Sequence, residues 1–225
     1  MRRQPSAMVF AAGFGTRMGE LCRDMPKPMV PFAGKPMICH CIGLLRDAGI
    51  TTIVANTHHL PQEIEPFLQS EGIAISREHP DILETGGGLK AAVPLLGNAP
   101  VITINPDAAW LGCNPVKVLI DAWRPAMQAL LALVPQSLAH GTSSAGDFRL
   151  EDGRVRRGGP LIYGGAQVIR TDQLDEVAEK VFSLNDYWDL LSEADGLHGL
   201  VYDGNWCDLG HPAGLRIAEG LAGHV

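Results

Sequence analysis

The stretch from Ala11 to Met18 and the tripeptide from Pro26 to Pro28 combine glycines with basic side chains, which suits phosphate binding. Small residues and glycines let a backbone approach a base and phosphates closely, with amide N–H groups turned toward the anion. Two basic residues add positive charge locally in a chain that is acidic as a whole. We therefore predict a nucleotide-binding loop that contains Ala11, Ala12, Gly13, Gly15, Thr16, Arg17 and Lys27.

Two other kinds of phosphate-binding loop do not fit this stretch. A dinucleotide fingerprint requires a third glycine where Met18 stands, and an acidic residue after the next strand, which ends in Asn56. A Walker loop requires Gly-Lys followed by Ser or Thr, and the sequence contains none. The pattern therefore favours a nucleotide site of another class.

Apolar runs that alternate with helical patterns would position this loop. Four short runs predict buried strands at Ala7–Ala12, Thr52–Asn56, Ala74–Glu78 and Val101–Asn105. Helical patterns fill the gaps at Pro36–Ala48, Pro61–Gln69 and Gly87–Leu95. This alternation predicts an α/β fold, a Rossmann-like three-layer sandwich with a mixed, mainly parallel sheet. Ligands of such sheets bind beyond the carboxyl ends of the strands, where the predicted loop lies.

The second half of the chain is less regular and predicts a partly antiparallel region. Strands are expected at Leu130–Val134, Asp147–Leu150, Arg154–Arg156, Tyr163–Ile169, Gly199–Tyr202 and Trp206–Leu209. Helices are expected at Thr171–Val181, Asp186–Ala194 and Pro212–Leu221. No linker, charge run or repeat divides the sequence, so we expect a single domain over residues 1–225.

Composition argues against several classes of protein. The net charge is -7 and no basic stripe is visible, so no nucleic-acid partner is expected. No run approaches the roughly 20 apolar residues that cross a bilayer, so no membrane partner is expected. The five cysteines form no Cys-x-x-Cys pair and fit small buried side chains in a reducing compartment. We expect a cytoplasmic protein that is a monomer or a homodimer.

Several motifs together resemble those of the sugar-phosphate nucleotidyltransferases. Ala-Ala-Gly-x-Gly-Thr-Arg-Met at residues 11–18 is similar to their N-terminal signature, and so is Pro-Lys-Pro-Met-Val-Pro-x-x-Gly-Lys-Pro-Met-Ile at residues 26–38. Motifs at residues 83–88, 146–150, 182–185 and 204–210 resemble the short N-acetylmuramate 1-phosphate uridylyltransferases of peptidoglycan recycling. The resemblance covers nearly the whole chain and implies the nucleotide-diphospho-sugar transferase type of fold.

The resemblance also implies roles for four charged residues. It places Arg17 and Lys27 on the triphosphate and the transferred phosphoryl group. It makes Asp107 and Asp208 ligands of Mg²⁺, a hard ion that keeps several waters and bridges protein to phosphate. Attack on phosphorus spreads negative charge over phosphate oxygens, so the chemistry needs positioned cations rather than a covalent nucleophile. These four residues are the catalytic candidates.

The binding candidates follow from the same resemblance. The base and ribose are expected on a loop whose glycines leave room for a flat ring and whose helix N-terminus favours anions, made of Glu84, Thr85, Gly86 and Gly87. Glu84 could instead cap the helix or lie on the surface. The acceptor sugar is expected near Asn56, Asp147, Tyr163, Gly165 and Asn185. For Asn56 a turn-capping role, and for Asp147 a hairpin-pinning role, stay open as alternatives.

Other conspicuous residues are given structural or modulating roles. Trp188 is expected in the core, and the neighbours His58 and His59 point to different sides without a third ligand, so no metal site is predicted there. Three residues depart from the family pattern, and we expect them to tune the chemistry rather than abolish it: Phe14, Pro106 and His211.

We therefore expect an enzyme that joins a nucleoside triphosphate to a sugar 1-phosphate, forms a nucleotide sugar and releases pyrophosphate. UTP and N-acetylmuramate 1-phosphate are the expected substrates, and UDP-N-acetylmuramate is the expected product. Two alternatives stay open. One is a hexose 1-phosphate or phosphorylated amino alcohol used with GTP, dTTP or CTP, and the other is a homologue that senses nucleotides without catalysis.

Overall fold

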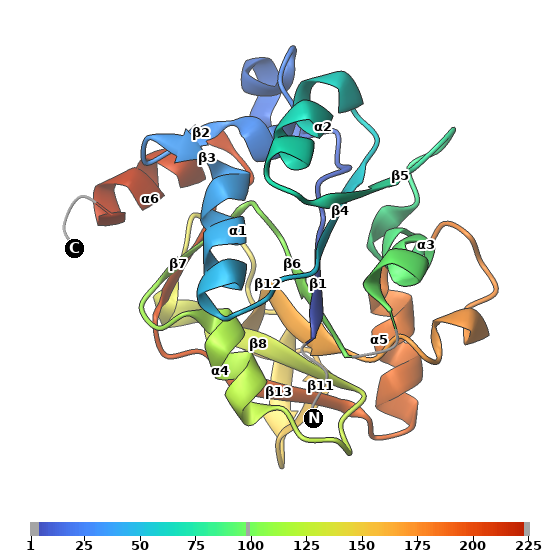
Figure 1. The fold of residues 1–225 in the computed structure, drawn as a ribbon. Helices are drawn as coiled ribbons and strands as arrows, with labels where there is room; N and C mark the ends of the chain where they lie inside the picture. Colours follow the sequence, from blue (N-terminus) through green and yellow to red (C-terminus); the bar gives the residue numbers. More distant parts are fainter. Residues whose placement is uncertain (1–4, 98–99, 223–225) are drawn as a thin grey trace.

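A mixed sheet forms the centre of the computed structural model, which describes residues 5–97 and 100–222. Within these residues the sheet has nine strands in the order β10-β11-β13-β8-β12-β6-β1-β4-β5 (Figure 1). In that order the strands are β10 (Phe148–Glu151), β11 (Arg154–Arg157), β13 (Leu197–Val201), β8 (Ala129–Pro135), β12 (Leu161–Ile169), β6 (Val101–Ile104), β1 (Ser6–Val9), β4 (Ile53–Thr57) and β5 (Ala74–Arg77).

The N-terminal part of the chain makes the parallel half of the sheet. β6, β1, β4 and β5 pair in parallel, and helices connect them in sequence. These helices are α1 (Met37–Asp47), α2 (Pro61–Ser70) and α3 (Glu84–Leu96). Parallel neighbours require such crossovers, so the carboxyl ends of the strands share one edge, toward the top of Figure 1. The predicted nucleotide loop leaves β1 at this edge.

The alternation of side chains along β1 explains the layers. Ala7 and Val9 belong to the core with α1, α2 and α4 (Pro115–Ala122), whereas Met8 belongs to the core with α3 and α5 (Leu184–Glu193). Successive strand residues point to opposite faces, so a fully apolar strand is covered on both. Helices therefore lie on each side of the sheet (Figure 1). The predicted three-layer α/β sandwich with a mixed sheet is confirmed.

A smaller sheet brings distant segments to the first loop. It contains β7 (Ala108–Leu111), β14 (Asn205–Asp208) and β9 (Ala139–His140). A separate apolar core joins it to the 3₁₀ helix η1 (Thr16–Cys22), the β2–β3 hairpin (Pro31–Phe32 and Lys35–Pro36) and α6 (Pro212–Ala222). Met18 and Cys22 of η1 pack in this core with Cys207 and Leu209. Figure 1 accordingly shows α6 beside β2 and β3.

The helix predicted over Thr171–Val181 is wrong. The structure has only a 3₁₀ turn, η4 (Leu174–Glu176), within this segment. Lys90 Nζ donates to the Val177 carbonyl at 2.8 Å, and the amides of Gly86 and Gly87 donate to the Phe182 carbonyl at 2.9 and 3.1 Å. A helix that continued past Val177 would need that carbonyl for its own amides. Packing against α3 therefore overrides the local helical pattern.

None of the helices in the part of the chain that the structure describes has the length and apolar content needed to span a membrane.

Candidate active site

Two aspartates predicted as metal ligands lie side by side at the edge of the small sheet. Asp107 directly precedes β7, and Asp208 is the last residue of β14. The strands are antiparallel, with Ala108 opposite Asp208. The Leu209 amide also donates to the Asp107 carbonyl at 2.8 Å. Strand pairing therefore brings two aspartates that are far apart in sequence to neighbouring backbone positions.

Each carboxylate has its own cation. Lys27 Nζ forms an ion pair with Asp107 Oδ2, and Arg17 Nη1 lies 3.2 Å from Asp208 Oδ2. The side chains of Lys27 and Asp107 are 14% and 22% exposed, whereas that of Arg17 is 61% exposed. The Gly210 amide donates to Asp208 Oδ1 at 2.7 Å. The four catalytic candidates thus form two ion pairs on neighbouring backbone segments, and the Lys27–Asp107 pair is the more buried of the two.

Gly15 explains how the first loop holds these cations. Its φ of +67° lies in the left-handed region, where it precedes η1. A Cβ on this glycine would lie 2.8 Å from Cys22 Sγ and 3.0 Å from Lys27 Cβ. A side chain would therefore be strained and would push against the residue that carries the inner cation.

A cavity of about 260 Å³ adjoins the Lys27–Asp107 pair. Its walls come from the ends of β1, β4 and β6 and from the start of α3. The predicted site residues on the walls are Ala12, Gly13, Lys27, Asn56, Glu84, Thr85 and Asp107. Residues not predicted for the site are Phe10, Pro28, Glu78, Ile82, Asn105 and Pro106. We call this the first cavity.

Asn56 and Glu78 form a buried connection behind the first cavity. Asn56 Oδ1 accepts from the Ala11 amide at 2.7 Å, and Asn56 Nδ2 donates to Glu78 Oε1 at 2.7 Å. Glu78 Oε2 accepts from the Leu83 amide at 2.7 Å. Both side chains are buried, so these bonds fix the loop after β1 relative to the loop before α3. Sequence reasoning missed Glu78, although an acid at the end of a predicted parallel strand was a signal.

The loop that opens α3 differs from the expected anion-binding helix N-terminus. The amides of Gly86 and Gly87 donate to the Phe182 carbonyl, and Thr85 Oγ1 accepts from the Leu184 amide at 2.9 Å. A Cβ on Gly86 would lie 2.3 Å from the Phe182 ring. These glycines therefore allow close packing against the neighbouring segment. Glu84, with φ of +64°, is the residue held in a strained conformation at the cavity wall.

A second cavity of about 390 Å³ shares a wall with the first. The shared residues are Phe10, Glu84, Thr85 and Asn105. The predicted acceptor residues on its own walls are Asp147, Tyr163 and Asn185. The others on these walls are Phe148, Arg157, Ser183, Leu184 and Trp188.

The predicted acceptor residues have structural partners in the second cavity. Asp147 Oδ2 accepts from the Tyr163 amide at 2.9 Å, and Ser144 Oγ donates to Asp147 Oδ1 at 3.2 Å. Asp147 thus pins the start of β12. Gly165, with φ of +87°, is absent from both walls and packs against the Asn105 side chain. Burial raises the pKa of the Tyr163 phenol, which stays protonated at neutral pH.

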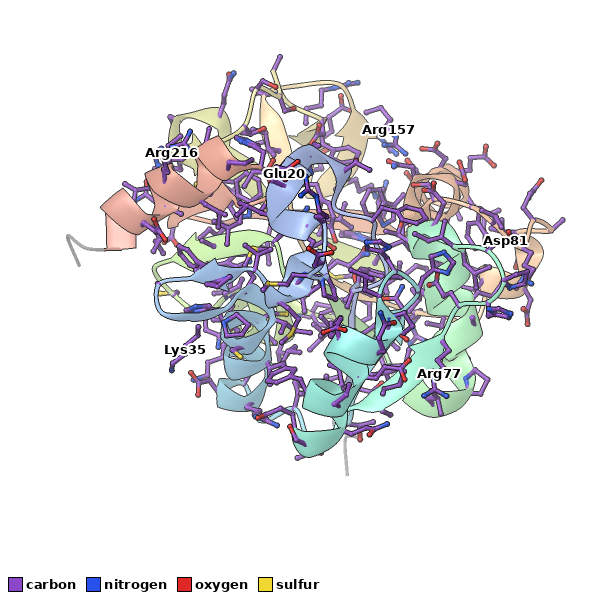
Figure 2. All side chains as sticks on the ribbon, turned by 90° about the horizontal axis from the view of Figure 1, so that it is seen from above. Glu20, Lys35, Arg77, Asp81, Arg157 and Arg216 are labelled. Carbon is purple, nitrogen blue, oxygen red and sulfur yellow. The ribbon has the colours of Figure 1, made fainter. Side chains whose placement is uncertain are left out.

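Arg157 is a cation at this site that the sequence did not indicate. It lies on the wall of the second cavity at the end of β11, beside α5 (Figure 2). Nη1 donates to Asn185 Oδ1 at 2.6 Å and Nε donates to Asp189 Oδ1 at 2.9 Å. A run of arginines in a predicted hairpin does not reveal which side chain faces a cavity.

Two buried thiols lie near the aspartates. Burial raises the pKa of Cys41, and the charge of Asp107 raises it further. Burial raises the pKa of Cys207 to about 11, and Asp208 contributes in the same direction. Both thiols are therefore neutral near pH 7 and add no negative charge beside the carboxylates. This agrees with their predicted role as small buried side chains.

The conspicuous residues without a predicted catalytic role have structural contacts. Trp188 is 4% exposed and donates from Nε1 to Gln167 Oε1 at 2.9 Å. The exposed ring of Phe14 lies 5.5 Å from both His58 and His59. His211 Nδ1 accepts from the Gly214 amide at 3.1 Å near the start of α6. The His211 imidazole thus makes a local hydrogen bond with the first turn of that helix.

The donor set at the aspartates fits a hard divalent cation. Asp107 and Asp208 supply carboxylate oxygens from neighbouring strand positions, and each carboxylate already pairs with a positive charge. Among the described residues, no group of three or more His, Cys, Asp or Glu side chains surrounds a metal position. Two carboxylates suit Mg²⁺, because this ion retains waters and shares its coordination with substrate phosphates.

The sequence is similar to those of known proteins. The family model described as MobA-like NTP transferase domain matches residues 7–197. N-acetylmuramate alpha-1-phosphate uridylyltransferase from Caulobacter vibrioides is 35% identical, over 95% of this chain and 95% of the relative. The protein of that name from Neisseria meningitidis is 33% identical, over 96% of this chain and 98% of the relative. A mannose-1-phosphate guanyltransferase from Gibberella zeae is 28% identical over 91% of this chain and 60% of its own length.

Solved structures share the fold at lower identity. The UTP-bound UGPase from Acinetobacter baumannii has a TM-score of 0.75 at 18% identity, over 97% of this chain and 93% of that chain. HddC from Yersinia pseudotuberculosis, complexed with GMP-PN, has a TM-score of 0.77 at 21% identity, over 97% of this chain and 100% of that chain. With the family match over residues 7–197, the prediction from the motifs is confirmed. The chain belongs to the MobA-like NTP transferase family and is one of its sugar-phosphate nucleotidyltransferases.

Proposed function

We propose that this enzyme transfers a uridylyl group from UTP to N-acetylmuramate 1-phosphate and releases pyrophosphate. The proposal is supported by the Lys27–Asp107 pair on the wall of the first cavity, with the Arg17–Asp208 pair on the neighbouring backbone segment and a second cavity adjoining the first. The two relatives that are 35% and 33% identical over nearly their full lengths support the choice of substrates.

The reaction is a direct displacement at phosphorus. An oxygen of the acceptor phosphate attacks the α-phosphorus of the triphosphate, a new P–O bond forms, and the bond to the bridging oxygen of pyrophosphate breaks. The acceptor phosphate is already an anion near pH 7, so no general base is required. Two anions must approach each other, which makes positioned positive charge the main contribution of the protein.

The cations have distinct tasks in this proposal. Lys27 is mostly buried beside the first cavity and would contact the transferred phosphoryl group. Arg17 is more exposed and would bind the β- and γ-phosphates, and later the leaving pyrophosphate. Asp107 and Asp208 would hold Mg²⁺, which when bound supplies charge neutralisation and aligns phosphate oxygens.

The two cavities suit the two substrates. The nucleotide would lie in the first cavity, over Gly13 and against Glu84 and Thr85. The sugar would lie in the second cavity near Asp147, Tyr163 and Asn185. Their shared wall, which includes Asn105, would bring the acceptor phosphate toward the α-phosphorus. The remaining predicted residues would act by shaping these walls: Ala11, Gly15, Thr16, Asn56, Gly86, Gly87 and Gly165.

A substrate panel tests the proposal. UTP, GTP, dTTP and CTP are each combined with N-acetylmuramate 1-phosphate, hexose 1-phosphates and a phosphorylated amino alcohol, and pyrophosphate release is measured. We expect the highest kcat/KM for UTP with N-acetylmuramate 1-phosphate. The 28% identical guanyltransferase makes GTP with mannose 1-phosphate the main rival pair. Nucleotide binding without pyrophosphate release for any pair would support a nucleotide-sensing protein instead.

We place the enzyme in the cytoplasm, in the recycling of peptidoglycan sugars, as a single catalytic domain that is a monomer or homodimer. All five cysteines are free thiols, and Cys113 is exposed, which suits a reducing compartment. Size-exclusion chromatography with light scattering distinguishes the two oligomeric states.

A further inference from the structure

Arg157 supplies positive charge to the second cavity. Among the described residues that line this cavity, Arg157 is the one Arg or Lys, and the acidic side chains there are Glu84 and Asp147. The Arg157 side chain is 45% exposed, and Figure 2 shows it between the strands around β11 and helix α5. The ring of a neutral sugar offers this cation no charged partner, so its partner is either the acceptor phosphate or an acidic group on the sugar.

The Arg157 guanidinium is held in a fixed plane. Its Nη1 and Nη2 donate to the side-chain and backbone oxygens of Asn185 at 2.6 and 3.0 Å, and Nε donates to Asp189 at 2.9 Å. Its central carbon lies 5.1 Å from the centre of the Phe148 ring. An arginine already ordered by the protein loses little conformational entropy when a ligand binds, so it is preorganised for recognition.

The guanidinium retains hydrogen-bonding capacity. Arginine has five N–H donors, and within the described residues the bonds to Asn185 and Asp189 leave an Nη1 hydrogen without a partner. The Asp189 side chain is 59% exposed, so water screens the effect of its charge on the cation. The guanidinium therefore keeps both its positive charge and an N–H donor for a ligand in the second cavity.

We infer that Arg157 binds a carboxylate carried by the acceptor sugar and makes the enzyme specific for acidic sugar 1-phosphates. This inference rests on the proposed function and adds a specificity residue to it. N-acetylmuramate differs from N-acetylglucosamine by a lactyl ether that ends in a carboxylate, and an arginine binds such a group with charge-assisted hydrogen bonds. Glu84 and Asp147 repel a carboxylate elsewhere on the wall, so they favour its placement at Arg157.

The experiment compares two sugars that differ only in the lactyl ether that carries this carboxylate. Pyrophosphate release from UTP is measured with N-acetylmuramate 1-phosphate and with N-acetylglucosamine 1-phosphate for the wild type, Arg157→Gln and Arg157→Lys. We expect Arg157→Gln to lower kcat/KM for the acidic sugar by about 10- to 100-fold while the value for the neutral sugar is kept. Arg157→Lys keeps the charge without the planar guanidinium, so its kcat/KM for the acidic sugar is expected to lie between those of the wild type and Arg157→Gln. The KM for UTP is expected to stay unchanged.

Arg154→Gln is the matched control, because Arg154 lies on the same strand, pairs with Asp195 and is absent from the cavity wall. Its preference for the acidic sugar should equal that of the wild type. A wild type without this preference, or an Arg157→Gln enzyme that keeps it, would overturn the inference and leave uridylyl transfer intact. An equal loss for both sugars in Arg157→Gln and Arg157→Lys would also overturn it, because Arg157 would then act on the shared phosphate or on the cavity wall. Failure of the wild type with every sugar would instead reject the proposed function.

Discussion

Asp107 and Asp208 are neighbours across two antiparallel strands, with the Leu209 amide bonded to the Asp107 carbonyl at 2.8 Å. Each carboxylate pairs with a different cation, Lys27 or Arg17. Two negative charges placed together are unfavourable unless positive charge is nearby. The two ion pairs and the proposed metal site therefore form one electrostatic unit, and a change in one member should affect the others.

Replacement of Lys27 by methionine tests the inner cation. Methionine keeps an unbranched side chain and removes the charge beside Asp107, so we expect kcat to fall by about 100- to 1,000-fold. Pyrophosphate release measures the effect. Lys35→Met, at an exposed position of β3, is the control and should keep wild-type activity. A Lys27→Met enzyme with wild-type kcat would show that the inner cation is dispensable.

Glu78→Gln tests the buried connection between the two nucleotide loops. Both oxygens of Glu78 accept from N–H donors, Asn56 Nδ2 and the Leu83 amide, whereas a glutamine amide accepts with only one end. We expect the free energy of unfolding to decrease by about 1–3 kcal/mol. Urea denaturation measures it, with Glu63→Gln on the exposed face of α2 as control. Equal midpoints for Glu78→Gln and Glu63→Gln would contradict this role.

Glu65 is expected to link stability to pH. Its hydrogen bond from Arg77 holds the pKa of this carboxyl below the usual value of 4.5, and the Thr57 hydroxyl acts in the same direction against the effect of burial. A carboxyl with a lowered pKa in the folded state stabilises the fold above 4.5, and this contribution is lost as the pH falls through the lowered pKa.

Glu65→Gln should therefore be less stable than the wild type near neutral pH. The difference should shrink as the pH falls below 4.5, because the wild-type carboxyl is then protonated as well. Urea denaturation over a pH series measures this. A difference that stays constant down to acidic pH would mean that the charge of Glu65 does not contribute.

The sequence predicted the elements that depend on local patterns. The strand and helix periods around β1, α1 and β4 were correct, because each buries an apolar face that is visible in the sequence. Helix α4 was missed although Asn114 and Pro115 are a helix-start signal, and Asn114 Oδ1 accepts from the Val116 amide at 2.9 Å. The helix predicted over Thr171–Val181 is absent because this segment bonds to α3, and no local sequence pattern indicates those contacts.

The same limit applies to the site. The motifs predicted the convergence of Lys27 with Asp107 because family resemblance supplied the long-range pairing. Gly86 and Gly87 were assigned to the nucleotide, but they pack against the segment around Phe182, which lies far away in the sequence. The pairing of β10 with β11 places Arg157 on the wall of the second cavity. The sequence of this short hairpin does not show which of its faces meets the cavity.

Asp107→Asn is the sharpest test of the proposed role of Asp107 as a metal ligand. The amide keeps the shape of the side chain and removes the negative charge between Lys27 and the proposed metal position. Pyrophosphate release from UTP and N-acetylmuramate 1-phosphate is measured for the wild type and Asp107→Asn over a range of Mg²⁺ concentrations. UTP binding to each enzyme is measured by calorimetry. We predict that turnover is lost while UTP binding weakens by a smaller factor. An Asp107→Asn enzyme that keeps the wild-type rate and Mg²⁺ dependence would contradict the account.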